Sequence, residues 1–176
     1  EFLQALEVSG SVDDKTGWRC NHLTVYSKSE LVALVPLYIK AHSYGEYVFD
    51  FQWADAYQQA GHCYYPKLLT AIPFTPASGR RVYISDKINE ERLMPFIVEA
   101  VIDFAKKQGL SSWHILFPES NENKDLSKLN LLSRSGIQYH WINQEYQHFD
   151  DFLAECKLKK RKNIKRERNA IHSQGL

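Results

Sequence analysis

Long apolar runs are scarce in this sequence. The longest, residues 31–39, is interrupted by Pro36 and is far shorter than the roughly 20 residues that a membrane-spanning helix needs. The N-terminus lacks the basic start, apolar run and small-residue cleavage site of a secretory leader. We therefore expect no membrane span and a cytoplasmic location. Because the chain opens on Glu1 without a methionine, we expect it to be a fragment of something longer.

Cysteine is equally scarce. Cys20, Cys63 and Cys156 are odd in number and far apart, which matches neither a disulfide framework nor a pair of zinc knuckles. The seven histidines are scattered, and the one His–Cys neighbour, His62 with Cys63, would point to opposite faces of a strand. The sequence therefore predicts reduced thiols and no metal site.

Glycine patterns that bind phosphate are missing. There is no GxGxxG and no GxxxxGK[ST]. The step that opens a helix in acetyl-coenzyme A sites, an Arg or Gln followed by glycines, is also missing ahead of the helix predicted from residue 91. We expect no cofactor bound in this chain.

What the sequence does have is enough apolar residue for a core. Of its 176 residues 44% are hydrophobic, 13% aromatic and 24% charged, which excludes overall disorder. The net charge of +1 hides an asymmetry, because residues 157–168 hold eight bases against one acid, a net charge of +7, so the rest of the chain carries −6. This imbalance favours an anionic partner for the tail.

The order of predicted elements indicates an α/β (α+β) fold. We expect a mixed, mostly antiparallel sheet flanked by helices, with a basic C-terminal helix. The predicted helices are 2–8, 54–60, 91–108, 126–135 and 150–173, and the predicted strands are 18–26, 31–40, 47–51, 64–72, 80–84, 112–117 and 137–146.

The first candidate site is the segment from Lys40 to Asp50, where aromatic, acidic and basic residues are densest. His42, Tyr44, Glu46 and Asp50 lie at even offsets and would share one face of a regular strand, although Gly45 could break it. Such a surface could hold a sugar, a peptide or a base. The alternative is a half-buried strand whose outer face is charged.

The second candidate site follows in residues 64–81. Two prolines would hold a rigid rim beside Lys67, Arg80 and Arg81, whose charges could meet a carboxylate or a phosphate. The alternative is a proline-punctuated crossing between strands with bases on its surface.

The third candidate is the tail helix, whose bases surround its axis while Leu153, Ile164 and Ile171 form a narrow seam. Contact with RNA or phosphate is one interpretation, and a solvated connector that leans on a further domain is the other. The anion- or RNA-binding candidates are Lys159, Lys160, Arg161, Lys162, Lys165 and Arg166.

Several strings of residues together resemble a known family. They are PLYIK (36–40), HSYGEYVFD (42–50), WADAY (53–57), YYPKL (64–68), PFTP (73–76), HILFP (114–118) and KRKNI (160–164). The chain resembles the bacterial FemAB-like proteins of peptidoglycan biosynthesis or recognition. The resemblance implies a GNAT-like N-acyltransferase fold over residues 1–148, with residues 149–176 as a basic helix leading to a second such domain.

The resemblance also implies a function. Fem enzymes transfer an amino acid from aminoacyl-tRNA to the peptide of a cell-wall precursor, so we expect an acyl or aminoacyl transfer to an amine, with acyl-CoA or aminoacyl-tRNA as donor. Glu46 and Asp50 are the weak candidates for catalysis, as base or amine anchor. The substrate-binding candidates are Lys40, His42, Tyr44, Tyr47, Trp53, Asp55, Tyr65, Lys67, Thr75, Arg80 and Arg81.

Three alternatives stay open at this point. The chain could be a recognition module that binds peptidoglycan or a peptide without turnover. It could belong to an acyl-CoA-dependent N-acetyltransferase whose donor site lies in the missing half. Or its tail alone could bind nucleic acid, tRNA included, in which case affinity should fall steeply with salt.

Overall fold

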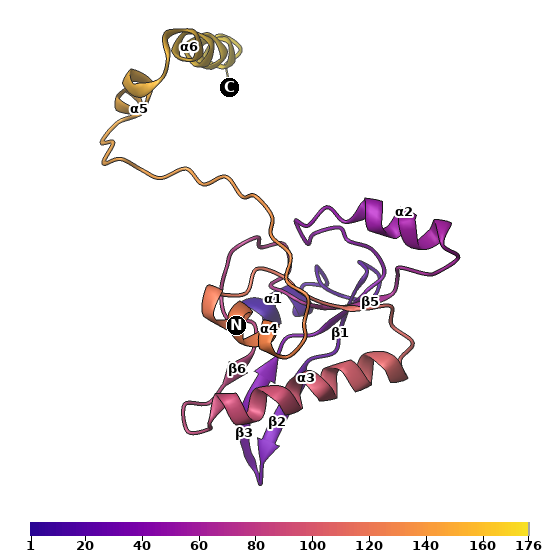
Figure 1. Cartoon of the computed structure of the whole chain (residues 1–176). Helices are drawn as coiled ribbons and strands as arrows, with labels where there is room; N and C mark the ends of the chain where they lie inside the picture. The colour runs from indigo at the N-terminus through magenta and orange to yellow at the C-terminus, as the bar shows by residue number, and fades with distance from the viewer. Residues whose placement is uncertain (176) are drawn as a thin grey trace. The chain divides into compact units, whose positions relative to one another are not determined.

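A computed structural model describes residues 1–175 and divides the chain into two compact units, Glu1–Ser133 and Arg134–Leu176 (Figure 1). The sequence placed the end of the first domain later, after residue 148. The first unit is an α+β arrangement with two small sheets, as expected for the fold class. A GNAT-like topology stays a prediction from the resemblance.

The larger sheet positions the candidate site. Its strand order is β1 (Trp18–Cys20), β4 (Tyr38–Lys40), β5 (Lys67–Thr70) and β7 (Trp113–Ile115). The β1–β4 and β4–β5 pairs are antiparallel and β5–β7 is parallel, so the sheet is mixed. The second sheet has the order β2 (Leu23–Ser27), β3 (Glu30–Val35) and β6 (Tyr83–Ile84).

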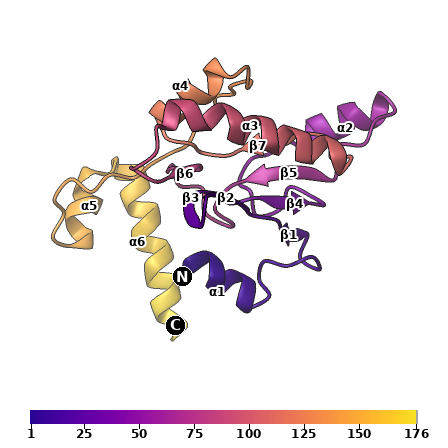
Figure 2. The same cartoon turned by 90° about the horizontal axis from the view of Figure 1, so that it is seen from below.

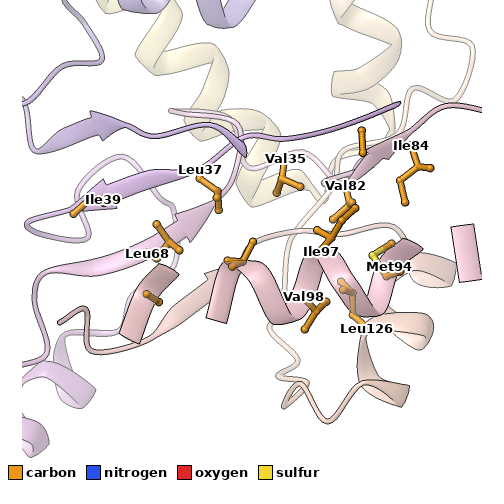
Figure 3. Close-up of a cluster of buried hydrophobic side chains, with 13 residues drawn as sticks. Val35, Leu37, Ile39, Leu68, Val82, Ile84, Met94, Ile97, Val98 and Leu126 are labelled. Atoms are coloured by element: carbon orange, nitrogen blue, oxygen red, sulfur yellow. The ribbon is translucent and has the colours of Figure 1, made fainter. Parts of the chain in front are cut away.

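Helix α3 (Glu90–Lys107) supplies the main core. Asn89 caps it by accepting a hydrogen bond from the Arg92 amide at 2.9 Å. Pro95 lies inside the helix, in its second turn, where proline has no amide hydrogen to donate to the Glu91 oxygen. Its buried face packs against strand residues such as Val35 of β3 and Leu68 of β5 (Figure 3). The residues of α3 on that face are Met94, Ile97, Val98, Val101 and Ala105. The periodicity that predicted this helix is confirmed.

Alternate residues of the strands face a second core. Leu68 of β5 belongs to the α3 core, whereas its neighbour Leu69 packs with Tyr38, Trp18 and Leu6 of helix α1 (Phe2–Val8). Figure 2 shows α3 and α1 on opposite sides of the larger sheet. The candidate site grows out of this second, aromatic core.

The expected strand 47–51 is wrong. Gly45 and Tyr47 have φ values of +81° and +58°, in the left-handed region, so the backbone turns there rather than extending. Asp50 stands at the N-cap of helix α2 (Phe51–Gln59), which begins earlier than predicted. His42, Tyr44, Glu46 and Asp50 therefore do not share one strand face.

The expected helix 126–135 is also wrong. Helix α4 spans Ser120–Lys128, and the chain turns at Asn130, whose φ is +62°. Leu126 of α4 enters the α3 core, so the apolar residue that suggested a later helix is the anchor of an earlier one.

The second unit differs most from expectation. Residues 137–146 form no strand within the described chain, and Ile137, Tyr139 and Ile142 are all exposed, so these apolar side chains do not form a buried face. The predicted last helix is two, α5 (Phe149–Glu155) and α6 (Leu158–Ser173). They are separated by extended backbone at Cys156 and Lys157.

Helix α5 begins one residue before the predicted start. Its capping box is formed by His148 and Asp151 rather than by the predicted cap, Asp150. The Asp151 carboxylate accepts a hydrogen bond from the His148 amide at 2.9 Å, which satisfies one of the free donors at the helix start.

Candidate functional site

Two lysines face each other in the larger sheet. Lys40 at the end of β4 and Lys67 at the start of β5 are register partners, and neither side chain is exposed to solvent. Both lie two residues from members of the aromatic core, Tyr38 and Leu69, and so point to the same face of the sheet. Like charges opposite each other are unfavourable, which means that neighbouring groups must neutralise them.

Lys67 has the denser set of partners. Its Nζ donates to Ser43 Oγ at 2.8 Å, to Glu46 Oε2 at 2.9 Å and to Asp50 Oδ2 at 2.6 Å. The Tyr64 hydroxyl donates to the same Asp50 oxygen at 2.7 Å, and the hydroxyls of Tyr65 and Ser43 are 2.8 Å apart. We call Lys40, Ser43, Glu46, Asp50, Tyr64, Tyr65 and Lys67 the lysine–carboxylate cluster.

Lys40 has a more apolar environment. Its Nζ lies 3.6 Å from the centroid of the Trp18 ring and donates to the backbone oxygen of Tyr44 at 3.2 Å. Burial lowers the pKa of Lys40 to about 7; Glu46 opposes this shift and the Lys67 charge adds to it. A substantial fraction of Lys40 is therefore a neutral amine near neutral pH.

The carboxylates of the cluster respond to burial in opposite ways. Burial raises the pKa of Glu46, although the nearby lysines pull it down. Burial also acts to raise the pKa of Asp50, but hydrogen bonds from Lys67, Ser43 and Tyr64 outweigh it and the net pKa is lowered. One carboxyl is thus poised to take a proton while the other stays ionised.

Two carboxylate oxygens in this cluster lack a hydrogen-bond donor. Glu46 Oε1 and Asp50 Oδ1 are buried, and neither has a partner among the described residues. An unsatisfied buried acceptor costs about 1–3 kcal/mol. These two oxygens could therefore accept hydrogen bonds from one more donor group.

The turn that brings the acids to Lys67 depends on Gly45. A Cβ at Gly45 would lie 2.6 Å from Phe74 Cε1 and 3.2 Å from Trp18 Cζ2. The Phe74 amide also donates to the Gly45 oxygen at 3.1 Å, which ties the turn to the 73–76 loop. Glycine at this position lets residues 41–50 (the cover loop) fold over the lysines.

The remaining predicted residues of the first site lie outside the cluster. Tyr44, Tyr47, Trp53 and Asp55 are exposed and His42 is partly exposed, so they form the outer surface of the cover loop and of α2. The structure thus separates an inner charged layer from an outer aromatic layer, which a single strand face does not do.

The predicted residues Thr75, Arg80 and Arg81 are engaged in local structure. Thr75 Oγ1 donates to the Pro73 oxygen at 3.1 Å, and Arg80 forms an ion pair with Glu90. The buried Arg81 guanidinium donates to the backbone oxygens of Leu116, Arg80 and Ala77. These contacts brace the 73–80 loop.

Glu122 is a buried residue that sequence reasoning missed. Its carboxylate accepts from the Arg81 amide at 3.0 Å and from the Val82 amide at 2.7 Å. Burial raises the pKa of Glu122 while these hydrogen bonds lower it, and burial prevails. Glu122 lies in the first turn of α4, ahead of the predicted helix 126–135, so no sequence pattern singled it out.

Glu7, Cys20 and His22 also gather, with ligand atoms within 4.8 Å of one another. His22 Nδ1 accepts from the Leu37 amide at 3.1 Å, so its Nε2 carries the proton and donates to Glu7 at 2.8 Å. Burial raises the pKa of the Cys20 thiol to about 11. Because a metal needs a free imidazole lone pair and a thiolate, this trio fits a hydrogen-bonded group better than a metal centre.

In the second unit, the tail candidates separate into two kinds. Lys159, Lys160, Lys162, Lys165 and Arg166 are exposed on α6. Arg161 instead donates to the oxygens of Leu153 at 2.7 Å, Ala154 at 2.5 Å and Cys156 at 3.0 Å. It closes the corner between α5 and α6.

No helix of residues 1–175 has the length and apolar character to cross a membrane.

Comparison with known proteins gives one assignment. Neither the curated proteins nor the solved structures contain a significant match. The FemAB-like family, described as peptidoglycan biosynthesis/recognition, matches residues 1–176. This match covers both the lysine–carboxylate cluster and helix α6, and the chain belongs to the FemAB-like family of peptidoglycan biosynthesis/recognition.

Proposed function

We propose that the lysine–carboxylate cluster binds the amine of a cell-wall peptide, as the acceptor half of an N-acyl transfer. The observation that carries this proposal is the pair of donor-less oxygens, Glu46 Oε1 and Asp50 Oδ1. An ammonium group has three donors and a positive charge, which suits two carboxylates that share one lysine. The family assignment supplies the peptidoglycan context.

In the proposed reaction Glu46 is the base and Asp50 the anchor of the amine. Glu46 takes a proton from the bound ammonium, which its raised pKa favours. The freed nitrogen lone pair forms a C–N bond to the donor's carbonyl carbon. The C–O bond of an aminoacyl-tRNA ester or the C–S bond of an acyl-CoA thioester then breaks, and the leaving oxygen or sulfur takes the proton from Glu46. The nitrogen gives its remaining excess proton to the Glu46 carboxylate, which releases it to water, and a neutral amide is left.

The donor is assigned to a second acyltransferase-like domain of the same chain. Residues 1–133 bind only the acceptor, because the sequence lacks the glycine-rich step of a coenzyme A site. The reaction would take place in the cytoplasm, on a precursor before its export.

Access to the cluster requires the cover loop to open. Glu46 and Asp50 are each 3% exposed in the closed state. The exposed rings of Tyr44 and Tyr47 lie on this loop and would contact the rest of the peptide, since flat aromatic groups with a polar tip suit such contacts.

The second candidate function is recognition of the same peptide without turnover. The burial of the cluster favours this alternative, because an acyl donor would have to reach an amine held at buried carboxylate oxygens. Under this alternative the outer layer of Tyr44 and Tyr47 binds the peptide and the inner charges hold the cover loop in shape.

Binding and turnover measurements separate the two. The full-length protein is assayed for transfer from acyl-CoA and from aminoacyl-tRNA to muropeptides that carry a free side-chain amine, and for calorimetric binding of the same muropeptides. Transfer by the wild type that Glu46→Gln abolishes, with Glu99→Gln on the exposed side of α3 as control, supports the proposal. Binding without transfer, weakened by Tyr44→Ala, supports recognition alone.

An amine-blocked muropeptide tests the amine itself. Acetylation of the side-chain amine removes its charge and should weaken binding at least tenfold if Glu46 and Asp50 hold it. Equal binding of the blocked and free peptides would remove the cluster from consideration.

A further inference from the structure

The second unit contains an aromatic hollow whose lining includes no residue of the lysine–carboxylate cluster. It has a volume of about 440 Å³ and is lined by Trp141, Asn143, Tyr146, Gln147, His148, Phe149 and Phe152. This volume falls within the range of about 300–1,000 Å³ that is typical of small-molecule sites. All the lining residues belong to the second unit, so the hollow is complete within it.

The aromatic rings of this hollow pack against one another in stacked and edge-to-face pairs. Trp141 and Tyr146 are stacked, with centroids 6.1 Å apart and an interplanar angle of 26°. Phe152 meets both of them edge-on, at 6.3 Å and 6.0 Å. Trp141 is nevertheless 66% exposed, which leaves a large flat surface facing solvent. Such a surface suits a ligand with a flat apolar face.

The backbone around the hollow is fixed by polar contacts. The Tyr146 amide donates to Asn143 Oδ1 at 3.0 Å, and the amides of Gln147 and His148 donate to Asp151 Oδ2 at 3.0 Å and 2.9 Å. The side chains of Asn143, Gln147 and His148 line the hollow beside the rings. Gln147 Nε2 donates to the Glu145 oxygen at 3.0 Å, so the other polar atoms of these side chains are the ones that can meet hydroxyls and an acetamido group.

A second hollow adjoins the first through a shared residue, Phe149. It has a volume of about 310 Å³ and is lined by Phe149, Asp150, Leu153, Lys165, Arg168 and Asn169, which is two bases against one acid. The Arg168 guanidinium carbon lies 4.2 Å from the centroid of the Phe149 ring. A pocket with a net positive charge therefore shares the Phe149 side chain with the aromatic one.

We propose that this aromatic hollow binds an acidic amino sugar, with its ring stacked on Trp141 and its carboxylate held by Lys165 and Arg168. The alternation of flat C–H faces and hydroxyls on a sugar matches the rings and the amide rim. The carboxylate matches the two cations in charge. The hollow accommodates a mono- or disaccharide of the kind that peptidoglycan strands contain.

The family assignment supports this ligand class, and the proposal does not depend on the amine site. Peptidoglycan offers a glycan as well as a peptide, and the family covers its biosynthesis or recognition. A single-stranded nucleic acid is the less suitable occupant, because a polyanion needs a continuous track of cations. Here Lys165 and Arg168 are the bases that line the second hollow, beside the acid Asp150, and the other exposed bases of α6 line neither hollow.

A matched pair of ligands tests the proposal on the full chain. N-acetylmuramic acid and N-acetylglucosamine differ by one lactyl carboxylate group, so both should stack but only the first should use the cations. Ligand-observed NMR and tryptophan fluorescence are expected to show binding of both sugars, with the acid binding more tightly.

Variants then separate the two hollows. Trp141→Ala should weaken both sugars about tenfold, and Trp141→Phe, which keeps a ring, should recover most of the affinity. Arg168→Gln should weaken only the acidic sugar, about fivefold. The control variants are Tyr139→Ala, an exposed ring of the same segment that does not line the hollow, and Arg92→Gln on the exposed side of α3; neither should change either affinity.

Three results would overturn the proposal. The first is equal affinity of wild type and Trp141→Ala for both sugars. The second is binding of a single-stranded oligonucleotide that Trp141→Ala abolishes, without binding of either sugar. The third is a concentration-dependent dimer, seen by sedimentation and lost in Trp141→Ala, which would show that a second copy covers the rings. None of these results bears on amine binding, because the sugars carry no free amine.

Discussion

Lys40 and Lys67 stand opposite each other in the antiparallel β4–β5 pair, and both side chains are completely buried. The protein neutralises only one of them directly, since Lys67 contacts Glu46 and Asp50 whereas Lys40 rests on the Trp18 ring. This difference in environment sets the expected effects of mutation and of pH.

Replacing Lys67 should be strongly destabilising. Lys67→Met leaves the buried Glu46 and Asp50 carboxylates without their shared cation, which is expected to cost about 3–5 kcal/mol in the free energy of unfolding. Urea denaturation at pH 8 measures it. The loss should be smaller at pH 5, because protonation of a carboxyl removes the uncompensated charge.

The pair Lys87–Glu30 is the matched control for that variant. It is an ion pair of the same chemistry, with side chains 75% and 59% exposed. Lys87→Met should therefore change the free energy of unfolding by less than about 1 kcal/mol. Similar losses of unfolding free energy in the two variants would mean that Lys67, Glu46 and Asp50 are accessible to water.

The stability of the protein should rise between pH 7 and pH 9 because of Lys40. Its pKa of about 7 in the folded state lies below the unfolded value of 10.5, so in this range the unfolded chain binds more protons than the folded one. The groups around it are Glu46, Lys67, Trp18 and the Tyr44 carbonyl.

The window stops at pH 9 because Cys20, Tyr38 and Tyr64 have raised pKa values and act in the opposite direction at higher pH. His42, whose pKa is lowered by burial, titrates below the window. Urea unfolding at pH 7, 8 and 9 should show the rise in wild type and a flat profile in Lys40→Met. A wild-type profile as flat as that of the variant would refute the assignment.

Gly45→Ala should disrupt the cover loop. Alanine there would adopt a φ of +81° and its Cβ would meet Phe74 and Trp18, so the expected cost is about 2–4 kcal/mol. Gly61→Ala is the control, since Gly61 has a similar φ of +77° but open space around its Cβ position. It should show the backbone strain alone, about 1–2 kcal/mol. Thermal unfolding of both variants checks the difference.

Glu122→Gln should loosen the 73–80 loop. The glutamine side chain has one carbonyl oxygen, and its amide group would meet the Arg81 or Val82 N–H donors in place of an acceptor. A loss of about 1–3 kcal/mol is expected. Hydrogen exchange at the Arg81 and Val82 amides measures it, and unchanged protection there would contradict this role.

The exposed bases of α6 should give polyanion binding that weakens with salt. Each phosphate neutralised on single-stranded RNA contributes about −0.7 to the log–log slope. Lys159→Gln or Lys160→Gln should make the slope shallower. Arg161→Gln should instead reduce helicity by circular dichroism, because Arg161 is already held by three backbone oxygens. No RNA binding by wild type at low salt would end the nucleic-acid hypothesis.

Local patterns in the sequence were sufficient for several elements. The amphipathic period of residues 91–108 specifies α3, because a helix of this length buries one continuous stripe. The hairpin of β2 and β3 follows from β-branched residues around a short polar turn. The family could also be identified from the sequence, because the resemblance is carried by short strings of consecutive residues.

Only the tertiary structure decided how the charged residues of the candidate site are paired. The alternation of residues 42–50 predicted one shared face, but left-handed backbone at Gly45 and Tyr47 turns Glu46 and Asp50 inward and leaves Tyr44 outside. Lys67 meets these acids from a strand 17 and 21 residues further along the chain. Periodicity reports which residues are neighbours along one element, whereas the ionisation of a buried lysine depends on groups that packing brings from other elements.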